Sequence, residues 1–278
     1  MPLKLMYITN NPEVARIARK YGVDRIWIDL ETKGKAERQQ GRDTVLSNHS
    51  IEDISKVASA VGRPDLLVRI NPLNYSSKKE IDLVINAGAD MIMLPMWRTV
   101  DDVKTFTELV NGRAKTVLLL ETADAVECLD EVLEMGGFDE IHIGLNDLHL
   151  SYGLTFMFEL LSNGTIENLC KKIAAYNIPY GFGGIAKIGQ GLIPAEKIIL
   201  EHYRIGSTRA ILSRSFCNAE LITDIEEIEK IFAENMAELR EFGKFAASAD
   251  QKVLEENKES LKLAVEQVAQ SLKKEETV

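Results

Sequence analysis

The chain has 278 residues, 45% of them hydrophobic and 27% charged, a balance that allows a globular protein with a substantial buried core. Its 33 basic against 43 acidic residues give a formal net charge of −10, which argues against nucleic acid as the main partner. No apolar run approaches the roughly 18 residues of a membrane span, and the amino-terminal segment has no signal-peptide pattern. Three widely spaced cysteines without a Cys-x-x-Cys pair indicate reduced packing residues. We therefore expect a cytoplasmic protein that binds neither membranes nor nucleic acid.

Short apolar runs that predict strands alternate along the chain with amphipathic segments that predict helices. The predicted strands cover residues 3–9, 25–31, 66–70, 91–94, 115–120, 140–143, 179–182 and 210–212. The predicted helices cover residues 12–21, 51–60, 78–87, 99–109, 123–135, 166–176 and 195–202. Several strand runs are continuously apolar, as expected for parallel strands buried on both faces. This α/β pattern favours a (β/α)8 TIM barrel with extra C-terminal helices, although an open doubly wound sheet has the same periodicity.

Two segments stand outside this repeat. Residues 32–49 form a long polar loop with several lysines and arginines, and long loops in compact domains are usually functional or disordered. The tail, residues 219–278, contains two amphipathic helical patterns. We therefore predict a barrel over residues 1–217 and a helical extension over 218–278, which either covers the barrel or contacts another subunit.

Polar side chains fall at or just past the carboxyl ends of five predicted strands. They are Thr9, Glu31, Arg69, Glu121 and Asp147. A charged residue at such a position must face a core or a cleft. In a barrel and in an open sheet alike, this end of the strands carries the active site.

Two of these carboxylates suggest a metal site. Glu121 and Asp147 follow neighbouring strands, in TVLLLE and IHIGLND, and little else neutralises them. Mg²⁺ typically takes one or two carboxylates plus water and ligand oxygens, but spacing alone also allows two salt-bridged carboxylates. Arg69, inside the apolar run LLVRINP, must also point at a partner. That partner is either Glu31 or Glu121, or a carbonyl or carboxylate of a ligand.

Four blocks of sequence carry a family resemblance. They are GVDRIWIDLE (22–31), LLVRINP (66–72), GADMIMLPM (88–96) and LLLETADAV…IHIGLNDLHLSYG (118–153). In this order and spacing they resemble the HpcH/HpaI aldolase and citrate lyase β-subunit family of the phosphoenolpyruvate/pyruvate barrel superfamily. IGSTRAILSRSF (205–216) fits less specifically, and the tail lies outside the match.

The resemblance implies a (β/α)8 barrel that assembles as a trimer or hexamer. It places the metal ligands at Glu121 and Asp147 and the ligand-binding arginine at Arg69. The backbone at Gly144, Leu145, Asn146 and Asp147 would hold the carboxylate of a 2-oxo acid such as pyruvate or oxaloacetate. Mg²⁺, or Mn²⁺ or Co²⁺, would share the developing enolate charge with Arg69.

This sequence departs from the family pattern in its proton-transfer residues. Family aldolases carry D-x-E-H after the second strand, whereas residues 29–32 read DLET, so Thr32 stands in place of the His. A hydroxyl without a partner cannot accept a proton at neutral pH as imidazole can. The acidic residue that supports that His corresponds, without gaps, to Asn86, and Met96 replaces a Lys common in lyase-like members. The enolate-binding half of the site is therefore present, and the proton-transfer half is missing or relocated.

The candidates for a relocated base are His49, Lys33 and a metal-bound water. His49 ends the long loop just before a predicted helix, where an exposed flanking role is equally compatible with the sequence. Glu31 is expected to orient the metal-bound water or Arg69. The expected catalytic residues are thus Arg69, Glu31 and His49, with the identity of the base open.

The remaining histidines and one glycine-rich motif have simpler interpretations. His149 is expected at the edge of the site, His142 in the core and His202 on a surface helix. GFGGIA (181–186) matches the spelling of a dinucleotide-binding fingerprint, but further glycines and a proline follow, so no helix opens directly behind it. We expect a loop after the seventh strand instead.

The predicted function is a divalent-metal-dependent aldolase or lyase that cleaves or forms a carbon–carbon bond of a 2-oxo acid through a pyruvate enolate. One alternative is a lyase for CoA thioesters of the citramalyl-CoA or citryl-CoA type, with the basic loop receiving the CoA phosphates. Another is a barrel that binds a 2-oxo acid without turnover, which the Thr32 replacement motivates.

Overall fold

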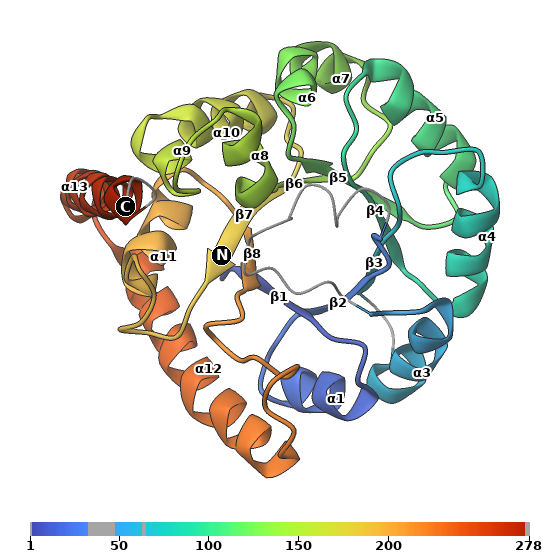
Figure 1. The fold of residues 1–278 in the computed structure, drawn as a ribbon, viewed down its shortest axis with the longest axis horizontal. Helices are drawn as coiled ribbons and strands as arrows, with labels where there is room; N and C mark the ends of the chain where they lie inside the picture. The colour runs from blue at the N-terminus through green and yellow to red at the C-terminus, as the bar shows by residue number, and fades with distance from the viewer. Residues whose placement is uncertain (1, 33–47, 63–64, 276–278) are drawn as a thin grey trace.

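The computed structural model describes residues 2–32, 48–62 and 65–275. Eight parallel strands, each hydrogen-bonded to its sequence neighbours, close into a barrel in the order β1 to β8 (Figure 1). They are β1 (Lys4–Ile8), β2 (Arg25–Asp29), β3 (Leu66–Arg69), β4 (Met91–Leu94), β5 (Lys115–Leu120), β6 (Glu140–Ile143), β7 (Tyr180–Ile185) and β8 (Arg209–Leu212). The pairing of β1 with β8 confirms the (β/α)8 barrel and excludes the open sheet.

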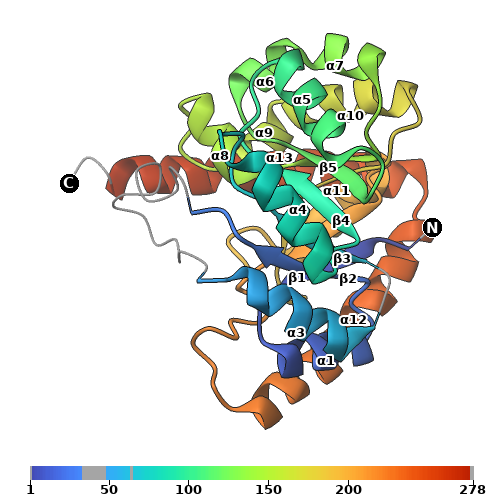
Figure 2. The same ribbon diagram turned by 90° about the vertical axis from the view of Figure 1, so that its right-hand side faces the viewer.

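Helices surround the barrel and cover its outer face (Figures 1 and 2). They are α1 (Pro12–Lys20), α3 (Ile51–Val61), α4 (Ser77–Ala87), α5 (Val100–Val110), α6 (Ala123–Glu127), α7 (Leu129–Met135), α8 (Leu145–Ser151), α9 (Glu159–Ser162), α10 (Thr165–Ala175), α11 (Ala195–Arg204), α12 (Ile225–Ser248) and α13 (Gln251–Glu275). Asn11 caps α1 as its sequence position suggests, accepting a hydrogen bond of 2.9 Å from the Glu13 amide. The predicted helix over 123–135 is divided at Cys128 into α6 and α7, and the short helices α8 and α9 have no periodic signal.

The barrel interior is layered by the alternation of side chains along the strands. Its amino-terminal end holds Arg25, Glu140 and Arg209, the first residues of β2, β6 and β8. Both guanidinium groups donate two hydrogen bonds to the Glu140 carboxylate, at 3.0 and 3.2 Å from Arg25 and at 2.8 and 2.9 Å from Arg209. Burial alone would raise the pKa of Glu140, but these hydrogen bonds outweigh it and lower the pKa to about 2.

The middle of the interior is mainly apolar. Trp27 and His142 pack edge to face there, with ring centroids 6.0 Å apart, among side chains that include Leu67, Met91 and Leu119. His142 is buried, as predicted, and burial together with the charge of Arg25 lowers its pKa to about 3. A neutral imidazole and an indole therefore separate the charged amino-terminal end of the barrel from the charged carboxyl-terminal end.

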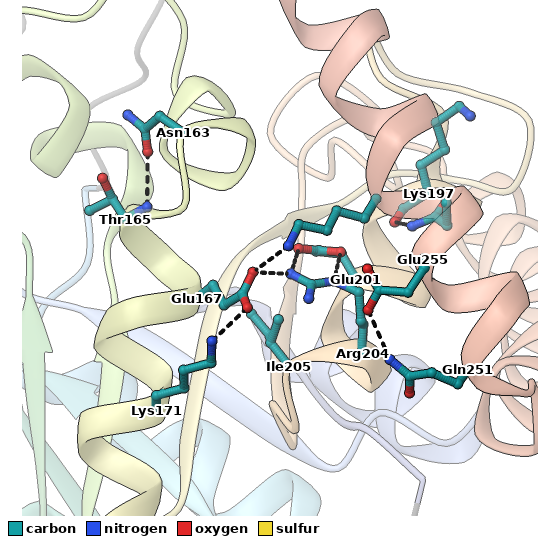
Figure 3. A network of polar contacts seen from close by, with 12 residues as sticks. Asn163, Thr165, Glu167, Lys171, Lys197, Glu201, Arg204, Ile205, Gln251 and Glu255 are labelled. Atoms are coloured by element: carbon teal, nitrogen blue, oxygen red, sulfur yellow. Dashed lines mark hydrogen bonds and ion pairs between the residues drawn. The ribbon is translucent and has the colours of Figure 1, made fainter.

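The tail forms two long helices on one side of the barrel. Helix α12 packs mainly against α1 and α11, burying Ile228, Phe232, Met236 and Leu239, and α13 packs against α9 and α11. Ion pairs accompany the second contact: Glu167 of α10 accepts from Arg204 of α11 at 2.8 Å and from Lys258 of α13 at 3.0 Å (Figure 3). The division of the chain at residues 217 and 218 stays a prediction.

Among the described residues, no helix combines the length and apolar character needed to cross a membrane.

Replacing Glu140 with Gln is expected to destabilise the protein by about 3–5 kcal/mol, because it leaves two buried guanidinium groups without their anion. The depressed pKa adds a pH dependence. Stability from this carboxylate is present above its ordinary pKa of 4.5 and is lost as the pH falls towards 2. Denaturant unfolding between pH 2.5 and 6 should therefore show a steeper acid loss in wild type than in Glu140→Gln.

Asp130→Asn is the matched control, since Asp130 forms an exposed pair with Lys172. It should leave both stability and its acid dependence nearly unchanged. Equal acid slopes in wild type and Glu140→Gln would contradict the account.

Candidate active site

Arg69 lies at the centre of a carboxylate cluster at the carboxyl-terminal end of the barrel. The register of β2 and β3 places it opposite Asp29. Its Nε and Nη2 donate to Oδ1 and Oδ2 of Asp29, both at 2.8 Å, and its Nη1 lies 3.1 Å from Oε2 of Glu31. Alternation along β2 puts Asp29 and Glu31 on the same side of the strand, so both can face one guanidinium.

These contacts keep Arg69 charged and well oriented. Burial alone would lower its pKa, but Asp29 and Glu31 raise the pKa far above its ordinary value. Its guanidinium carbon also lies 5.5 Å from the centroid of the Trp27 ring, which supports it from below. Three of its five N–H donors serve the two carboxylates, which leaves one donor each on Nη1 and Nη2.

Glu121 follows β5 and has only 2% of its surface exposed. Its Oε1 accepts a hydrogen bond of 3.0 Å from the Met96 amide. Met96 has φ 54°, in the left-handed region that is unusual for a residue with a side chain, and this backbone turn accompanies the amide contact with Glu121. Burial raises the pKa of Glu121 to about 8; Arg69 opposes the rise, and Asp147 and Glu31 add to it.

Asp147 lies near Glu121, after the neighbouring strand β6. It lies in the first turn of α8, directly after β6, and its charge is close enough to affect the pKa of Glu121. Gly144 joins β6 to α8 beside Glu121. A Cβ at Gly144 would lie 2.9 Å from both Cβ and Oε2 of Glu121, so the space beside this carboxylate exists because the residue is glycine.

The donor set fits a divalent cation. The described residues bring four carboxyl groups, of Asp29, Glu31, Glu121 and Asp147, to a single arginine. Asp29 and Glu31 hold Arg69, whereas Glu121 and Asp147 follow the neighbouring strands β5 and β6 and are the carboxylates that a cation would bind. No group of three or more potential metal ligands is found among the described residues, so the chain would supply two ligands and solvent or substrate oxygens the others.

A polar chain at the start of the long loop connects two strand ends. The amide and hydroxyl of Thr32 donate to Oδ1 of Asn71, at 3.0 and 3.3 Å. The amide and Nδ2 of Asn71 donate in turn to Oε1 of Glu80, at 3.1 and 2.8 Å. Thr32 is thus supported by an acidic residue of α4, but that residue is Glu80. The ungapped correspondence with Asn86 is wrong, because Asn86 lies exposed in the last turn of α4, at the opposite end of the barrel.

His49 lies beside the end of β2, although much of its loop does not belong to the described residues. The Asp29 amide donates to Nδ1 of His49 at 3.0 Å. Because a backbone amide can only donate, this nitrogen carries no proton and the neutral ring bears its proton on Nε2. Lys33 and the other basic residues of the loop, at 33–47, lie outside the described residues.

The contacts of His149 and His202 are with neighbouring parts of the fold. His149 is buried, and its Nδ1 lies 3.1 Å from the Leu145 carbonyl in the preceding turn of α8. The prediction for His202 is wrong. It is fully buried between α11 and β7, where it stacks on Phe182 at 3.7 Å and pairs with the Ser207 hydroxyl.

The glycines of GFGGIA serve close packing. A Cβ at Gly181 would lie 2.3 Å from the Arg209 carbonyl oxygen, and one at Gly183 would lie 2.7 Å from Cδ1 of Leu145. A Cβ at Gly184 would lie 3.1 Å from Cβ of Ser213, the residue that follows β8. The three glycines lie within β7, which runs to Ile185, so the expectation of a loop at this motif is wrong, and the resemblance to a dinucleotide fingerprint has a packing explanation.

Sequence reasoning missed Asp29, Asn71 and Glu80. Asp29 had a usable signal, because it precedes Glu31 by two residues and therefore shares its face of β2. Asn71 and Glu80 had no such signal. They contact residues of other segments, and the periodicity of a sequence does not show which segments meet. The Gly144 amide also differs from expectation. It donates to the Leu120 carbonyl at 3.0 Å, so it is committed to the barrel and does not face a ligand.

Gly144→Ala is expected to push the Glu121 side chain out of place, because the new methyl group would overlap it. We expect Mn²⁺ affinity, measured by titration, to fall at least about tenfold, with a stability loss of about 1–3 kcal/mol. Gly243→Ala in α12 is the control, since a Cβ there makes only an ordinary contact of 3.7 Å with the Tyr203 hydroxyl. Unchanged Mn²⁺ affinity in a folded Gly144→Ala variant would remove Glu121 from the metal site.

Comparison with known proteins agrees with this geometry. Residues 4–159 match the family model for HpcH/HpaI aldolase/citrate lyase. The solved structure of an HpcH/HpaI aldolase from Desulfitobacterium hafniense DCB-2 has a TM-score of 0.57 and 16% identity, covering 84% of this chain and 93% of that one. An HpcH/HpaI aldolase/citrate lyase family protein from Burkholderia cenocepacia J2315 has a TM-score of 0.60 and 14% identity, covering 82% and 94%.

At these identities the two structures show likeness of fold alone, and no curated protein sequence matches the chain. The family model, however, matches more than half of the chain and includes Arg69, Glu121 and Asp147. The chain therefore belongs to the HpcH/HpaI aldolase/citrate lyase family.

Proposed function

We propose that this protein is a divalent-metal-dependent carbon–carbon lyase that cleaves or forms a bond of a 2-oxo acid through a pyruvate enolate. Membership of an aldolase/citrate lyase family supports lyase chemistry. The observation that carries the finer proposal is the carboxylate cluster itself. Arg69 is held by Asp29 and Glu31. Glu121 lies close enough for the charge of Arg69 to lower its pKa, and Asp147 lies close enough to raise it.

Glu121 and Asp147 would hold the cation, with Mg²⁺, Mn²⁺ or Co²⁺ as the candidates. When bound, a divalent cation supplies positive charge at the carbonyl oxygen of the ligand and stabilises the charge of the enolate. The buried position of Glu121 strengthens any electrostatic interaction made there, because little solvent screens it.

Arg69 would bind the same oxygen or the neighbouring carboxylate of the ligand. Its remaining donors on Nη1 and Nη2 point from a guanidinium whose position Asp29 and Glu31 already determine, so little reorganisation accompanies the reaction. Glu31 therefore acts by orienting Arg69. The ligand carboxylate would be received by the amides of Leu145, Asn146 and Asp147 in the first turn of α8, where amides have no acceptor within the helix.

His49 would contribute as a hydrogen-bond donor. With Nδ1 accepting from the Asp29 amide and Nε2 carrying the proton, the ring can take up a further proton only at Nδ1, by losing that hydrogen bond. This favours a role in stabilising negative charge on the substrate over that of general base. Thr32, whose hydroxyl donates to Asn71, is also not placed to act as a base.

A homo-oligomeric state, trimeric or hexameric, and a cytoplasmic location stay predictions. The alternative of a CoA thioester lyase depends on the basic loop at 33–47, which lies outside the described residues.

Turnover of oxaloacetate in the presence of Mg²⁺, Mn²⁺ or Co²⁺, followed as pyruvate release, tests the proposal. Wild type should exceed the enzyme-free metal rate, and Asp147→Ala should lose about 10²–10³ of the catalysed rate because half of the cation site is removed. Thr32→His is measured in parallel. Activity in Thr32→His together with an inactive wild type would mean that the binding half is intact and the natural reaction uses another substrate.

Arg69→Lys should lower kcat/KM by about 10²–10³, because an ammonium group cannot keep the two contacts to Asp29 while facing the ligand. Arg113→Lys, at an exposed position that pairs with Asp82, should leave the rate unchanged. Full activity in Arg69→Lys and Arg69→Ala would refute the role given to this residue. Turnover of a citramalyl-CoA-type thioester but of no free 2-oxo acid would favour the CoA alternative.

A further inference from the structure

The carboxylate of Asp147 is carried by residues 144–162, which leave the barrel after β6 and return at α10. The inner part of this excursion is tied to the other metal-ligand candidate. The Ala123 amide, two residues after Glu121, donates to the Ser151 hydroxyl at the end of α8, at 2.8 Å. The Leu154 amide donates to the His149 carbonyl at 2.9 Å, which holds the following residues against the helix.

The outer part of the excursion ends in α9 and is joined to α8 by apolar packing. Leu145, at the start of α8, and Phe158, at the start of α9, both lie within reach of a Cβ placed on Gly183, at 2.7 and 3.9 Å. Phe156 packs edge to face on Phe158 with centroids 5.4 Å apart. Glu159 accepts from the amides of residues 155 and 156, at 3.0 and 2.8 Å, so the approach to α9 is well ordered. A displacement of α9 would therefore be passed to Leu145 and the first turn of α8.

Helix α13 packs against the outside of α9 (Figure 1). Its buried face presents Leu261, Val265 and Ala269. Polar contacts determine its position. Asn257 donates to the Lys197 carbonyl of α11 at 3.0 Å, and Lys258 donates to Glu167, which also pairs with Arg204 (the Glu167–Arg204 pair is seen in Figure 3). Helix α12, in contrast, packs mainly against α1 and α11.

We propose that α13 is a positioning element of the active site, which holds α9 in place and thereby the first turn of α8 with Asp147. Leu261, buried in α13 at 1% exposure, is the positioning residue that the proposal assigns to this helix. The effect of α13 on catalysis rests on the proposed function, but the mechanical coupling of α13 to α9 and α8 does not. The matched family region ends at residue 159, so this coupling joins the family part of the chain to a tail outside it.

The test compares two identical substitutions in the full chain, Leu261→Ala in α13 and Leu239→Ala in α12. The two side chains are buried alike, at 1% and 2% exposure, but only α13 packs closely against α9. Hydrogen exchange of the wild type and both variants is measured without metal or substrate, with the amides of Leu148, Tyr152 and Leu154 as reporters. Mn²⁺ affinity and the kcat and KM of oxaloacetate turnover are measured on the same samples.

Leu261→Ala should speed exchange across residues 145–162 by about tenfold or more while leaving β1 to β5 protected. It should also weaken Mn²⁺ binding and raise KM more than it changes kcat. Leu261→Met should restore wild-type values, and Leu239→Ala should lower the melting temperature with no selective exchange at 145–162. If Leu261→Ala does not fold, Lys258→Met, which removes one ion pair of α13, provides the milder variant.

Unchanged exchange at 145–162 in Leu261→Ala and Lys258→Met, or the same response in Leu239→Ala, would overturn the proposal. Selective exchange without any wild-type turnover would support the coupling and count against the proposed function alone. Metal binding and KM that stay unchanged despite selective exchange would overturn the positioning role of α13.

Discussion

The main constraint on this protein is the charge balance at the carboxyl-terminal end of its barrel. Four carboxyl groups come from three strand ends, those of β2, β5 and β6, or the turns behind them, and Arg69 forms ion pairs with two of these carboxylates. Carboxylates that are buried close to one another repel each other unless a proton or a cation lies between them. Burial raises the pKa of Glu121 and the charge of Asp147 adds to the rise, and a divalent cation is the partner that the proposed function assigns to these two carboxylates.

The rest of the barrel supports that balance. The amino-terminal end has its own buried ion cluster, but there two guanidinium groups meet one carboxylate, so the sign of the excess is reversed. Trp27 and His142 lie between the two ends, and the low pKa of His142 keeps an additional positive charge out of the core. Among the described residues, Arg69 forms ion pairs with Asp29 and Glu31, and the Trp27 ring beneath it helps to keep it oriented toward them.

The polar groups around Thr32 and His49 differ in character from those around Arg69 and Glu121. Thr32, which the family resemblance aligns with a histidine, is held by Asn71 and through it by Glu80, while His49 is held by the Asp29 amide. Both arrangements favour hydrogen-bond donors near the end of β2 over a strong base. Chemistry that needs charge stabilisation more than proton abstraction, such as the decarboxylation of a 2-oxo acid or retro-aldol cleavage with a base supplied from another segment, suits such a site.

The sequence by itself determined the barrel and its active end. Continuous apolar runs separated by amphipathic segments specify buried parallel strands, and polar residues after those runs must gather where parallel strands end. Arg69, Glu121 and Asp147 were identified in this way, and Glu31 as a neighbour of Arg69. Tertiary structure decided which groups meet: Asp29 with Arg69, Glu80 with Thr32 through Asn71, and α13 with α9. It also buried His202 and exposed Asn86. Periodicity reports which face of an element is covered, whereas hydrogen-bond partners depend on the distances between elements that only the closed barrel defines.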